Sequence, residues 1–376
     1  MNNRPVVLII ENSIAVTGAL KSITRTAYDL KDTFDFRFVI PQNSTGRFWI
    51  EDKGFSVIYE LPMMEISKRL SSLMLYLPFL TLNAFRLRKI VRREKAAIIH
   101  VNDLYNLLPL VLRLFRNKTP YVCHIRFLPN RFPSWLFNFW LKLHLSYASR
   151  LIAVSKSVLR MLPYHPKLIV IHNELPVEDR YAERILPFIH VPPYTFLYLS
   201  NFMIGKGQNF ALEAFAKVHA DLPDWRLRFV GGDMGLAKNR HYKEELWETA
   251  KSLGLLESID WMGFTEEVER EYKKADIVLN FSESESFSIT CLEALYFGRP
   301  LIATDCGGPS EIIDDRQTGI LVANRNSDAM AMAMKELALD EELRVALSTM
   351  AKEAVRVKFS IENTSLKLKE VYMSIL

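Results

Sequence analysis

Two glutamates stand close together in the stretch SESESFSITCLEALYFGRPLIATDCGG, which runs from Ser282 to Gly308. Glu293 interrupts a mostly apolar run, where a buried carboxylate is costly unless strong hydrogen-bond donors meet it. The two hydroxyls of a ribose would be such donors. Glu285 precedes the same run, although Ser or Asp caps a helix better than Glu does. Each glutamate alone is more often structural, through capping or an ion pair, but the two together indicate a ligand site.

The segments around these glutamates predict a strand, a loop, a helix and a second strand. Residues 276–281 form the first strand, and the helix runs from Phe287 or Ser288 to Phe297, with Gly298 directly after it. Ligands of parallel α/β sheets bind beyond the carboxyl ends of the strands. A helix N-terminus at that edge presents N–H groups without intrahelical partners, so the sequence predicts a phosphate site there.

The 376 residues are too many for one compact core, and short apolar strands alternate with helices along the whole chain. This alternation predicts an α/β fold with two doubly wound, Rossmann-like parallel sheets. We place the first domain at residues 1–178, the second at 179–358 and a last helix at 359–376. The expected strands are residues 5–10, 34–40, 55–60, 96–101, 120–125, 150–155, 167–173, 195–200, 225–232, 259–263, 276–281, 300–305 and 319–323. Long helices are expected at 18–30 and 71–94, and the last helix is amphipathic through Leu366, Leu368, Val371 and Tyr372.

The cysteines and the first residues bear on the compartment. Cys123, Cys291 and Cys306 show no paired spacing, which suits a reducing environment and argues against a disulfide framework or a thiolate metal site. The first apolar run is short and stops at Glu11, which predicts a strand and not a signal peptide. We therefore expect a cytoplasmic protein.

Charge is distributed unevenly between the two halves. Residues 1–180 hold 26 Lys and Arg against 13 Asp and Glu, and the remainder holds 22 against 30. A basic first half favours an anionic partner: membrane phospholipid, a phosphate-bearing substrate or nucleic acid. Nucleic acid is disfavoured because no recognisable binding motif accompanies the charge.

Two basic, aromatic and apolar stretches, at residues 67–95 and 131–150, could lie in a bilayer interface. The alternative, that their apolar residues are core and their charges a solvated face, stays open. Peripheral contact with the inner face of an anionic membrane is therefore one hypothesis. A membrane span is not expected, because the strongest apolar run is short and contains Pro78.

The stretch from Glu285 to Glu293 resembles the E-x7-E motif of the retaining glycosyltransferases of family 4. Further stretches resemble the same family: HVND at 100–103, VCHIRF at 122–127, LIAVSKSV at 151–158, VIHNELP at 170–176, YLSNFMIGKGQNFALEAFAKV at 198–218 and GRPLIATDCGGPSEIIDDRQTGILV at 298–322. The resemblance covers nearly the whole chain and is most specific from about residue 196 to 325. It implies the GT-B arrangement, in which two Rossmann-like domains face a central cleft that holds a nucleotide-sugar, and we expect the last helix to pack back on the first domain.

By this resemblance, Glu285 would contact hydroxyls of the donor sugar and Glu293 those of the ribose. Lys206 matches the lysine that neutralises the diphosphate, and its flanking glycines permit close backbone approach. A cation suits that place, because the leaving nucleoside diphosphate gains negative charge in the transition state. Backbone N–H groups near the helix start would bind the sugar and pyrophosphate; they belong to Ser286, Phe287, Ser288 and Ile289.

In the first domain, the resemblance places His124 beside the transferred sugar and Gly18 near the donor pyrophosphate. A lone strand-end histidine is more often a hydrogen-bonded structural residue, and the loop of Gly18 lacks a full dinucleotide fingerprint. One departure stands out, because Asn201 occupies a position where many relatives carry Arg. Arg126 is a candidate substitute for that charge.

Three polar residues at strand ends complete the candidate set. Asn102, Asp103 and Asn173 could bind the acceptor or the sugar, or could simply cap the helices that follow. The sequence does not separate these alternatives.

The resulting hypothesis is a retaining transfer of a sugar, as a hexosyltransferase, from a nucleotide-diphosphate sugar such as a UDP-sugar to an acceptor hydroxyl. The preferred acceptor is a lipid-linked or cell-surface polysaccharide intermediate. We expect no cofactor and no metal, since Lys206 and the helix dipole can carry the diphosphate charge and the chain lacks a metal signature. Two alternatives stay open: a non-hydrolysing nucleotide-sugar epimerase, and a non-catalytic subunit that binds a nucleotide-sugar or a membrane.

Overall fold

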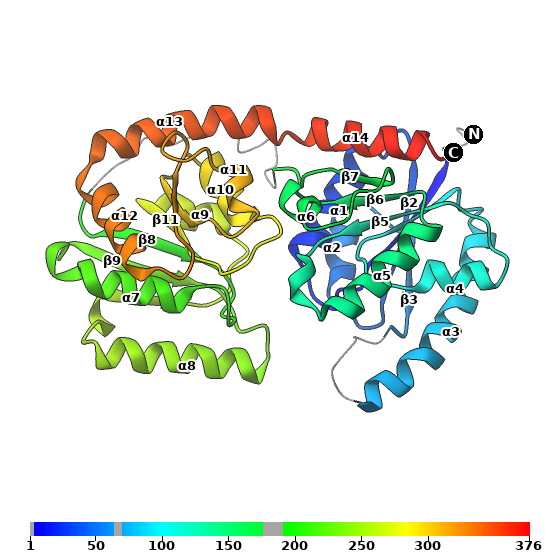
Figure 1. Ribbon diagram of the computed structural model, residues 1–376, viewed down its shortest axis with the longest axis horizontal. Coiled ribbons are helices and arrows are strands. Elements are labelled where there is room, and N and C mark those ends of the chain that lie inside the picture. Colours follow the sequence, from blue (N-terminus) through cyan, green and yellow to red (C-terminus); the bar gives the residue numbers. More distant parts are fainter. Residues whose placement is uncertain (1–3, 64–69, 176–190) are drawn as a thin grey trace. The chain divides into compact units, whose positions relative to one another are not determined.

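The computed structural model describes residues 4–63, 70–175 and 191–376 (Figure 1). The chain divides into two compact units, one formed by Met1–Glu174 with Phe359–Leu376 and the other by Leu175–Lys358. The expected boundary between residues 178 and 179 lies outside the described residues.

The first unit contains a seven-stranded parallel sheet in the order β3-β2-β1-β4-β5-β6-β7. Its strands are β1 (Val6–Ile10), β2 (Asp35–Pro41), β3 (Ile58–Leu61), β4 (Ile98–Val101), β5 (Tyr121–Ile125), β6 (Arg150–Ala153) and β7 (Leu168–Val170). Its helices are α1 (Gly18–Asp29), α2 (Gly46–Asp52), α3 (Leu70–Arg93), α4 (Leu108–Leu114), α5 (Ser134–Tyr147), α6 (Lys156–Arg160) and α14 (Ile361–Met373). The strand order reverses between β1 and β4, and such a switch point is where ligands bind parallel sheets.

The second unit contains a six-stranded parallel sheet in the order β10-β9-β8-β11-β12-β13. Its strands are β8 (Tyr194–Leu199), β9 (Trp225–Val230), β10 (Ile259–Met262), β11 (Ile277–Asn280), β12 (Leu301–Thr304) and β13 (Ile320–Val322). Its helices are α7 (Gln208–Val218), α8 (Ala237–Ser252), α9 (Val268–Lys274), α10 (Ile289–Tyr296), α11 (Pro309–Ile312), α12 (Ser327–Leu339) and α13 (Glu341–Lys358). The switch point here lies between β8 and β11.

The predicted fold class, two Rossmann-like parallel-sheet domains, is confirmed. Each expected strand range contains or overlaps an observed strand, because fully apolar strands such as Val6–Ile10 are buried on both faces in parallel sheets. In the part of the chain that the structure describes, no helix is long and apolar enough to cross a membrane.

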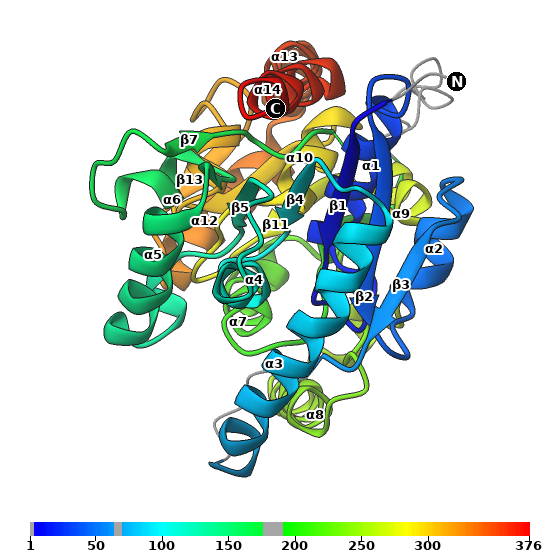
Figure 2. The same cartoon turned by 90° about the vertical axis from the view of Figure 1, so that its right-hand side faces the viewer.

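Helix α14 packs against α1 of the first unit, although the two are far apart in the sequence (Figure 2). Ser360 caps it by accepting a hydrogen bond from the Asn363 N–H group at 3.2 Å. Leu368, Val371 and Tyr372 join the core beside Phe34 and Phe36. Leu366, counted among the apolar residues of this amphipathic helix, is 56% exposed and does not join this core.

Candidate active site

Lys206 and Glu285 form an ion pair at the switch point of the second unit. Lys206 lies in the loop after β8 and Glu285 in the loop after β11, and these strands are neighbours. Lys206 Nζ is 2.6 Å from Glu285 Oε1, which also accepts a hydrogen bond from Ser282 Oγ at 3.0 Å. The two side chains keep 27% and 13% of their surface exposed, so a ligand can reach both.

The backbone on both sides of Lys206 requires glycine. Gly205 and Gly207 have φ angles of +88° and +80°, in the left-handed region. A Cβ atom on Gly207 would lie 1.9 Å from the carbonyl oxygen of Phe281, whereas a Cβ on Gly205 would meet nothing within 4 Å. Gly207 therefore allows the Lys206 loop to approach the β11 end, and Gly205 serves only the turn.

The loop that carries Glu285 is held by its backbone. The Glu285 N–H group donates to the Cys306 carbonyl at 3.3 Å, and the Gly308 N–H group donates to the Glu285 carbonyl at 2.7 Å. A Cβ on Gly308 would lie 2.5 Å from Phe287 Cα, so the two loops are in direct backbone contact. This contact fixes the chain immediately before α10.

Ser288 is the N-cap of α10. Its Oγ accepts from the Cys291 N–H group at 3.3 Å and from Asn280 Nδ2 at 2.9 Å. The hydroxyl is thus committed to the protein, and a ligand here would meet backbone groups instead. Ile289 and Thr290 open the helix, where N–H groups have no intrahelical acceptor, and the structure gives them none among its described residues.

Glu293 lies one turn further along α10 and is half-buried, not fully buried as the apolar sequence pattern suggested. Tyr272 on α9 donates its hydroxyl to Glu293 Oε2 at 3.0 Å. Burial first, and then the neighbouring Glu293 charge, raise the pKa of Tyr272, so this residue stays a donor. Sequence reasoning missed Tyr272, because a tyrosine within a charged helix carries no signal of its own.

Asn201, where the family resemblance led us to expect Arg, has a defined structural role. Its Oδ1 accepts from the Gly232 N–H group at 3.1 Å, and its carbonyl accepts from Gln208 Nε2 at 3.0 Å. The side-chain amide of Asn201 thus holds the loop after β9, and its backbone carbonyl holds the start of α7.

His124, at the end of β5 in the first unit, is the last member of a buried hydrogen-bond chain. His100 Nε2 lies 2.7 Å from His124 Nδ1, and His100 Nδ1 bonds the hydroxyl of Tyr372 on α14. Burial, followed by the charge of Arg126, lowers the pKa of His100 to about 3 and that of His124 well below its usual value. Both imidazoles are therefore neutral at pH 7.

The donors around His124 determine its tautomer. Arg126 Nη2 lies 3.5 Å from His124 Nδ1, and a guanidinium can only donate. His124 Nδ1 is then an acceptor, His100 Nε2 carries a proton, and Tyr372 donates to His100 Nδ1. The outer nitrogen of His124, Nε2, consequently carries a proton and is a hydrogen-bond donor.

Arg126 links the other strand-end residues predicted from the sequence. Its Nε donates to Asn102 Oδ1 and its Nη1 to Asn173 Oδ1, both at 2.8 Å. Two carboxylates that sequence reasoning missed complete the network: Glu11 accepts from Asn102 Nδ2, and Glu174 accepts from Ser22 Oγ at 2.9 Å. Both lie at strand ends, where a buried acid could have been suspected.

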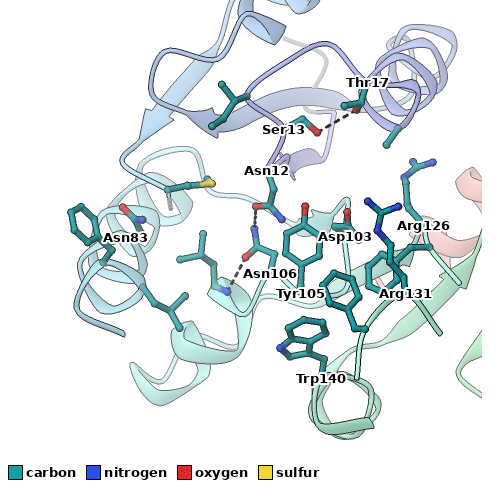
Figure 3. Close-up of a pocket in the computed structure, with 18 residues that line it drawn as sticks. Asn12, Ser13, Thr17, Asn83, Asp103, Tyr105, Asn106, Arg126, Arg131 and Trp140 are labelled. Carbon is teal, nitrogen blue, oxygen red and sulfur yellow. Dashed lines mark hydrogen bonds between the residues drawn. The ribbon is translucent and has the colours of Figure 1, made fainter. Parts of the chain in front are cut away.

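A cavity of about 460 Å³ opens beside this network, at the carboxyl ends of β1, β4 and β5 (Figure 3). Asp103 and Arg126 line one side of it, and Asn83 on α3 lines the other. Burial, then repulsion from Glu11, raise the pKa of Asp103 to about 7. Gly18, also predicted for the site, is the first residue of α1, whose N-cap Thr17 lines the same cavity.

The structure thus gathers the predicted residues into two groups, one in each unit. Lys206, Glu285, the loop 286–289 and Glu293 surround the start of α10, while His124, Asn102, Asp103, Arg126 and Asn173 meet at the β4 and β5 ends. Among the residues that the structure describes, no cluster of three or more His, Cys, Asp or Glu side chains could hold a metal ion.

Two family models match the chain. The model of glycosyl transferases group 1 matches residues 185–354, and that of glycosyltransferase family 4 matches residues 65–178.

Curated relatives match over about half of this chain. The D-inositol 3-phosphate glycosyltransferase of Corynebacterium urealyticum is 32% identical over 174 residues, 45% of this chain and 40% of that protein. The N-acetyl-alpha-D-glucosaminyl L-malate synthase of Bacillus anthracis is 28% identical over 180 residues, 48% of this chain and 45% of that protein. The matched region thus spans less than half of either relative.

Solved structures match over nearly the whole chain at low sequence identity, and this similarity supports the fold alone. Anabaena Alr3699/HepE, in complex with UDP and glucose, superimposes with a TM-score of 0.81 at 18% identity, over 98% of this chain and 99% of that one. The sucrose-phosphate synthase of Thermosynechococcus elongatus superimposes with a TM-score of 0.76 at 17% identity, over 99% of both chains.

Proposed function

Because the chain belongs to family 4 of the glycosyltransferases, we propose that it transfers a hexosyl group from a nucleoside-diphosphate sugar to an acceptor hydroxyl with retention of configuration. The observation that carries this proposal is the Lys206–Glu285 pair, 2.6 Å apart, beside the N-terminus of α10 at a sheet switch point. A cation, a helix N-terminus and a polar carboxylate are what a sugar diphosphate requires.

Each group of the second unit has a part in this proposal. Lys206 Nζ and the first N–H groups of α10 bind the diphosphate and stabilise the charge that grows on it as the sugar leaves. Glu293, oriented by Tyr272, accepts hydrogen bonds from the ribose hydroxyls. Glu285 turns from Lys206 to the hydroxyls of the transferred sugar.

The reaction breaks the bond between the anomeric carbon and the diphosphate oxygen and forms one between that carbon and the acceptor oxygen. The acceptor proton goes to the departing diphosphate oxygen. His124 Nε2–H, in the first unit, is a hydrogen-bond donor, and the family resemblance assigns it to the transferred sugar. No step requires a cofactor or a metal, since Lys206 and α10 supply the positive charge.

UDP is the nucleotide we propose for the donor, with support from the UDP and glucose bound to the Anabaena neighbour. For the acceptor we propose a lipid-linked or cell-surface polysaccharide intermediate, met at the inner face of the cytoplasmic membrane. Support for contact with anionic lipid comes from exposed apolar residues that lie among basic ones on α3, α4 and the loop after α4. The apolar residues are Leu77, Leu82, Phe85 and Leu114, and the basic ones are Arg86, Lys89, Arg92, Arg93, Arg116 and Lys118.

A thermal-shift series with UDP-, GDP- and ADP-sugars tests the proposal. Binding to the folded state raises the melting temperature, and Glu293→Ala is expected to abolish that rise without loss of fold. Transfer or hydrolysis of the donor is then measured through the release of the nucleoside diphosphate. A wild-type protein that no nucleotide-sugar stabilises, or that only epimerises the donor, would refute the proposal.

A further inference from the structure

The cavity of the first unit has one aromatic wall. Tyr105, Phe127, Phe132 and Trp140 form a continuous cluster, with ring centroids 5.0 Å apart for Phe127 and Phe132 and 5.1 Å for Phe132 and Trp140. Tyr105 stacks on Phe127 at 6.1 Å. Such a wall offers flat apolar surface to a ligand with a flat apolar face of its own.

Amides and apolar side chains make up most of the rest of the lining, and the larger apolar ones are Ile14, Met63, Phe79, Leu80 and Leu108. Asn106 Nδ2 donates to Asn12 Oδ1 at 2.6 Å, and Figure 3 shows this pair between Asn83 and Tyr105. Asn83 is 3% exposed and its Nδ2 donates to the Pro62 carbonyl at 3.1 Å. Its Oδ1 has no hydrogen-bond partner among the described residues, and a buried acceptor left in that state is costly. Asn83 Oδ1 therefore points to a ligand that donates a hydrogen bond.

The charged side chains at the cavity do not by themselves select its occupant. Asp103, Arg126 and Arg131 line it and can carry a charge at neutral pH. The Arg126 guanidinium donates to Asn102 and Asn173, while the raised pKa of Asp103, about 7, leaves this carboxyl partly protonated. Arg131 is exposed. An acyl chain could contact the apolar part of the lining but cannot donate a hydrogen bond to Asn83 Oδ1.

We propose that this cavity binds a neutral sugar ring of the acceptor, with an apolar face on the aromatic wall and hydroxyls on the amides of Asn12, Asn83 and Asn106. The proposal rests on the proposed function and assigns a neutral sugar ring of that acceptor to these residues. The cavity volume of about 460 Å³ lies within the range of small-molecule sites, roughly 300–1,000 Å³.

The test measures the binding of neutral methyl hexosides and disaccharides to the full chain by saturation-transfer NMR on the sugar protons. Asn83→Leu removes the unpaired acceptor and keeps a side chain of similar size, so sugar binding is expected to weaken by about tenfold or more. Trp140→Phe makes the aromatic wall smaller and is expected to weaken sugar binding severalfold. Should Asn83→Leu fail to fold, Trp140→Phe alone decides the question.

Asn239→Leu is the matched control. Asn239 is 2% exposed and donates one hydrogen bond to a backbone carbonyl, that of Asp233, at 3.1 Å, but it lies in the second unit. This variant should bind the sugars as the wild type does. If the wild type binds none of them, or if Asn83→Leu and Trp140→Phe bind them unchanged, the inference is wrong. Stabilisation by UDP is measured in the same samples, and its absence would count against the proposed function instead.

Discussion

Lys206 Nζ lies 2.6 Å from Glu285 Oε1, so the two groups that we propose for donor binding form an ion pair with each other. Their loops follow neighbouring parallel strands at a switch point, 79 residues apart in the sequence. A diphosphate would replace the carboxylate as the partner of Lys206 and leave Glu285 for the sugar. We therefore expect a bound donor to open this pair.

Lys206→Ala is expected to lower the rate of transfer or donor hydrolysis by about 100- to 1,000-fold, the range found when one group that stabilises a developing anion is removed. This rate is measured through the release of the nucleoside diphosphate. The double variant Lys206→Glu, Glu285→Lys keeps an ion pair but exchanges the charges. Recovery of activity in that variant would show that the pair acts only in folding.

Gly205→Ala and Gly207→Ala form a second test, because both glycines have positive φ but different surroundings. At Gly205 only the strain of the left-handed conformation applies, about 1–2 kcal/mol of unfolding free energy. At Gly207 the Cβ also meets the Phe281 carbonyl at 1.9 Å, which adds an overpacking cost of about 1–3 kcal/mol. Denaturant unfolding of both variants gives the comparison. Equal losses would mean that the Lys206 loop is not pressed against the β11 end.

The sequence was sufficient for the architecture because parallel strands are marked by short runs of apolar residues. The group around α10 was also predictable, since a strand, a loop with Glu285, and a helix with Glu293 follow one another within one segment. Glu293 was expected to be buried and is half-buried. The reason is that α10 buries one of its faces and keeps the face with Glu293 partly exposed.

The side-chain partners could not be predicted, because they come from distant segments. Tyr272 bonds Glu293 from another helix, and Tyr372 reaches His100 from a helix 272 residues further along the chain. Neither tyrosine lies in a motif. Such contacts depend on how helices pack on the sheet, which local periodicity does not encode.

Tyr272→Phe is expected to weaken nucleotide binding by about tenfold, the value of one hydrogen bond to a charged group. The hydroxyl lies 3.0 Å from Glu293 Oε2 and 3.2 Å from the Thr290 carbonyl oxygen, and without it the carboxylate loses one of the contacts that orient it. Titration with UDP by calorimetry gives the dissociation constant. Tyr242→Phe serves as a control, because that hydroxyl bonds Asn209 and not Glu293. Unchanged affinity for UDP in Tyr272→Phe would mean that Glu293 does not bind the nucleotide.

Asp103→Asn is expected to change how stability depends on pH. Burial and Glu11 raise the pKa of Asp103 from 3.8 to about 7, so the folded state holds this proton across a range where the unfolded state has lost it. The free energy of unfolding that depends on Asp103 therefore falls as pH rises from about 4 to 7. The variant should gain stability relative to the wild type over that range, measured by thermal unfolding. Asp52→Asn, at a carboxylate 72% exposed, should show no such trend, and a flat difference for Asp103→Asn would contradict the shift.

Tyr372→Phe tests whether the last helix positions His124. The variant removes the hydroxyl that donates to His100 Nδ1. Only the 3.5 Å contact between Arg126 Nη2 and His124 Nδ1 then still favours one tautomer of the two histidines, and the His124 Nε2–H group is no longer assured. We expect kcat to fall by about tenfold or more with an unchanged dissociation constant for UDP, and the ¹⁵N signals of His124 to shift from one tautomer to a mixture. Tyr121→Phe is the matched control, because Tyr121 is also buried and its hydroxyl lies 3.2 Å from Nδ1 of another histidine, His144. Both variants should lose about 1 kcal/mol of stability, but the control should keep the His124 tautomer and the turnover. A single tautomer retained in Tyr372→Phe would exclude the relay, and a mixture with normal turnover would show that the tautomer of His124 has no part in the reaction.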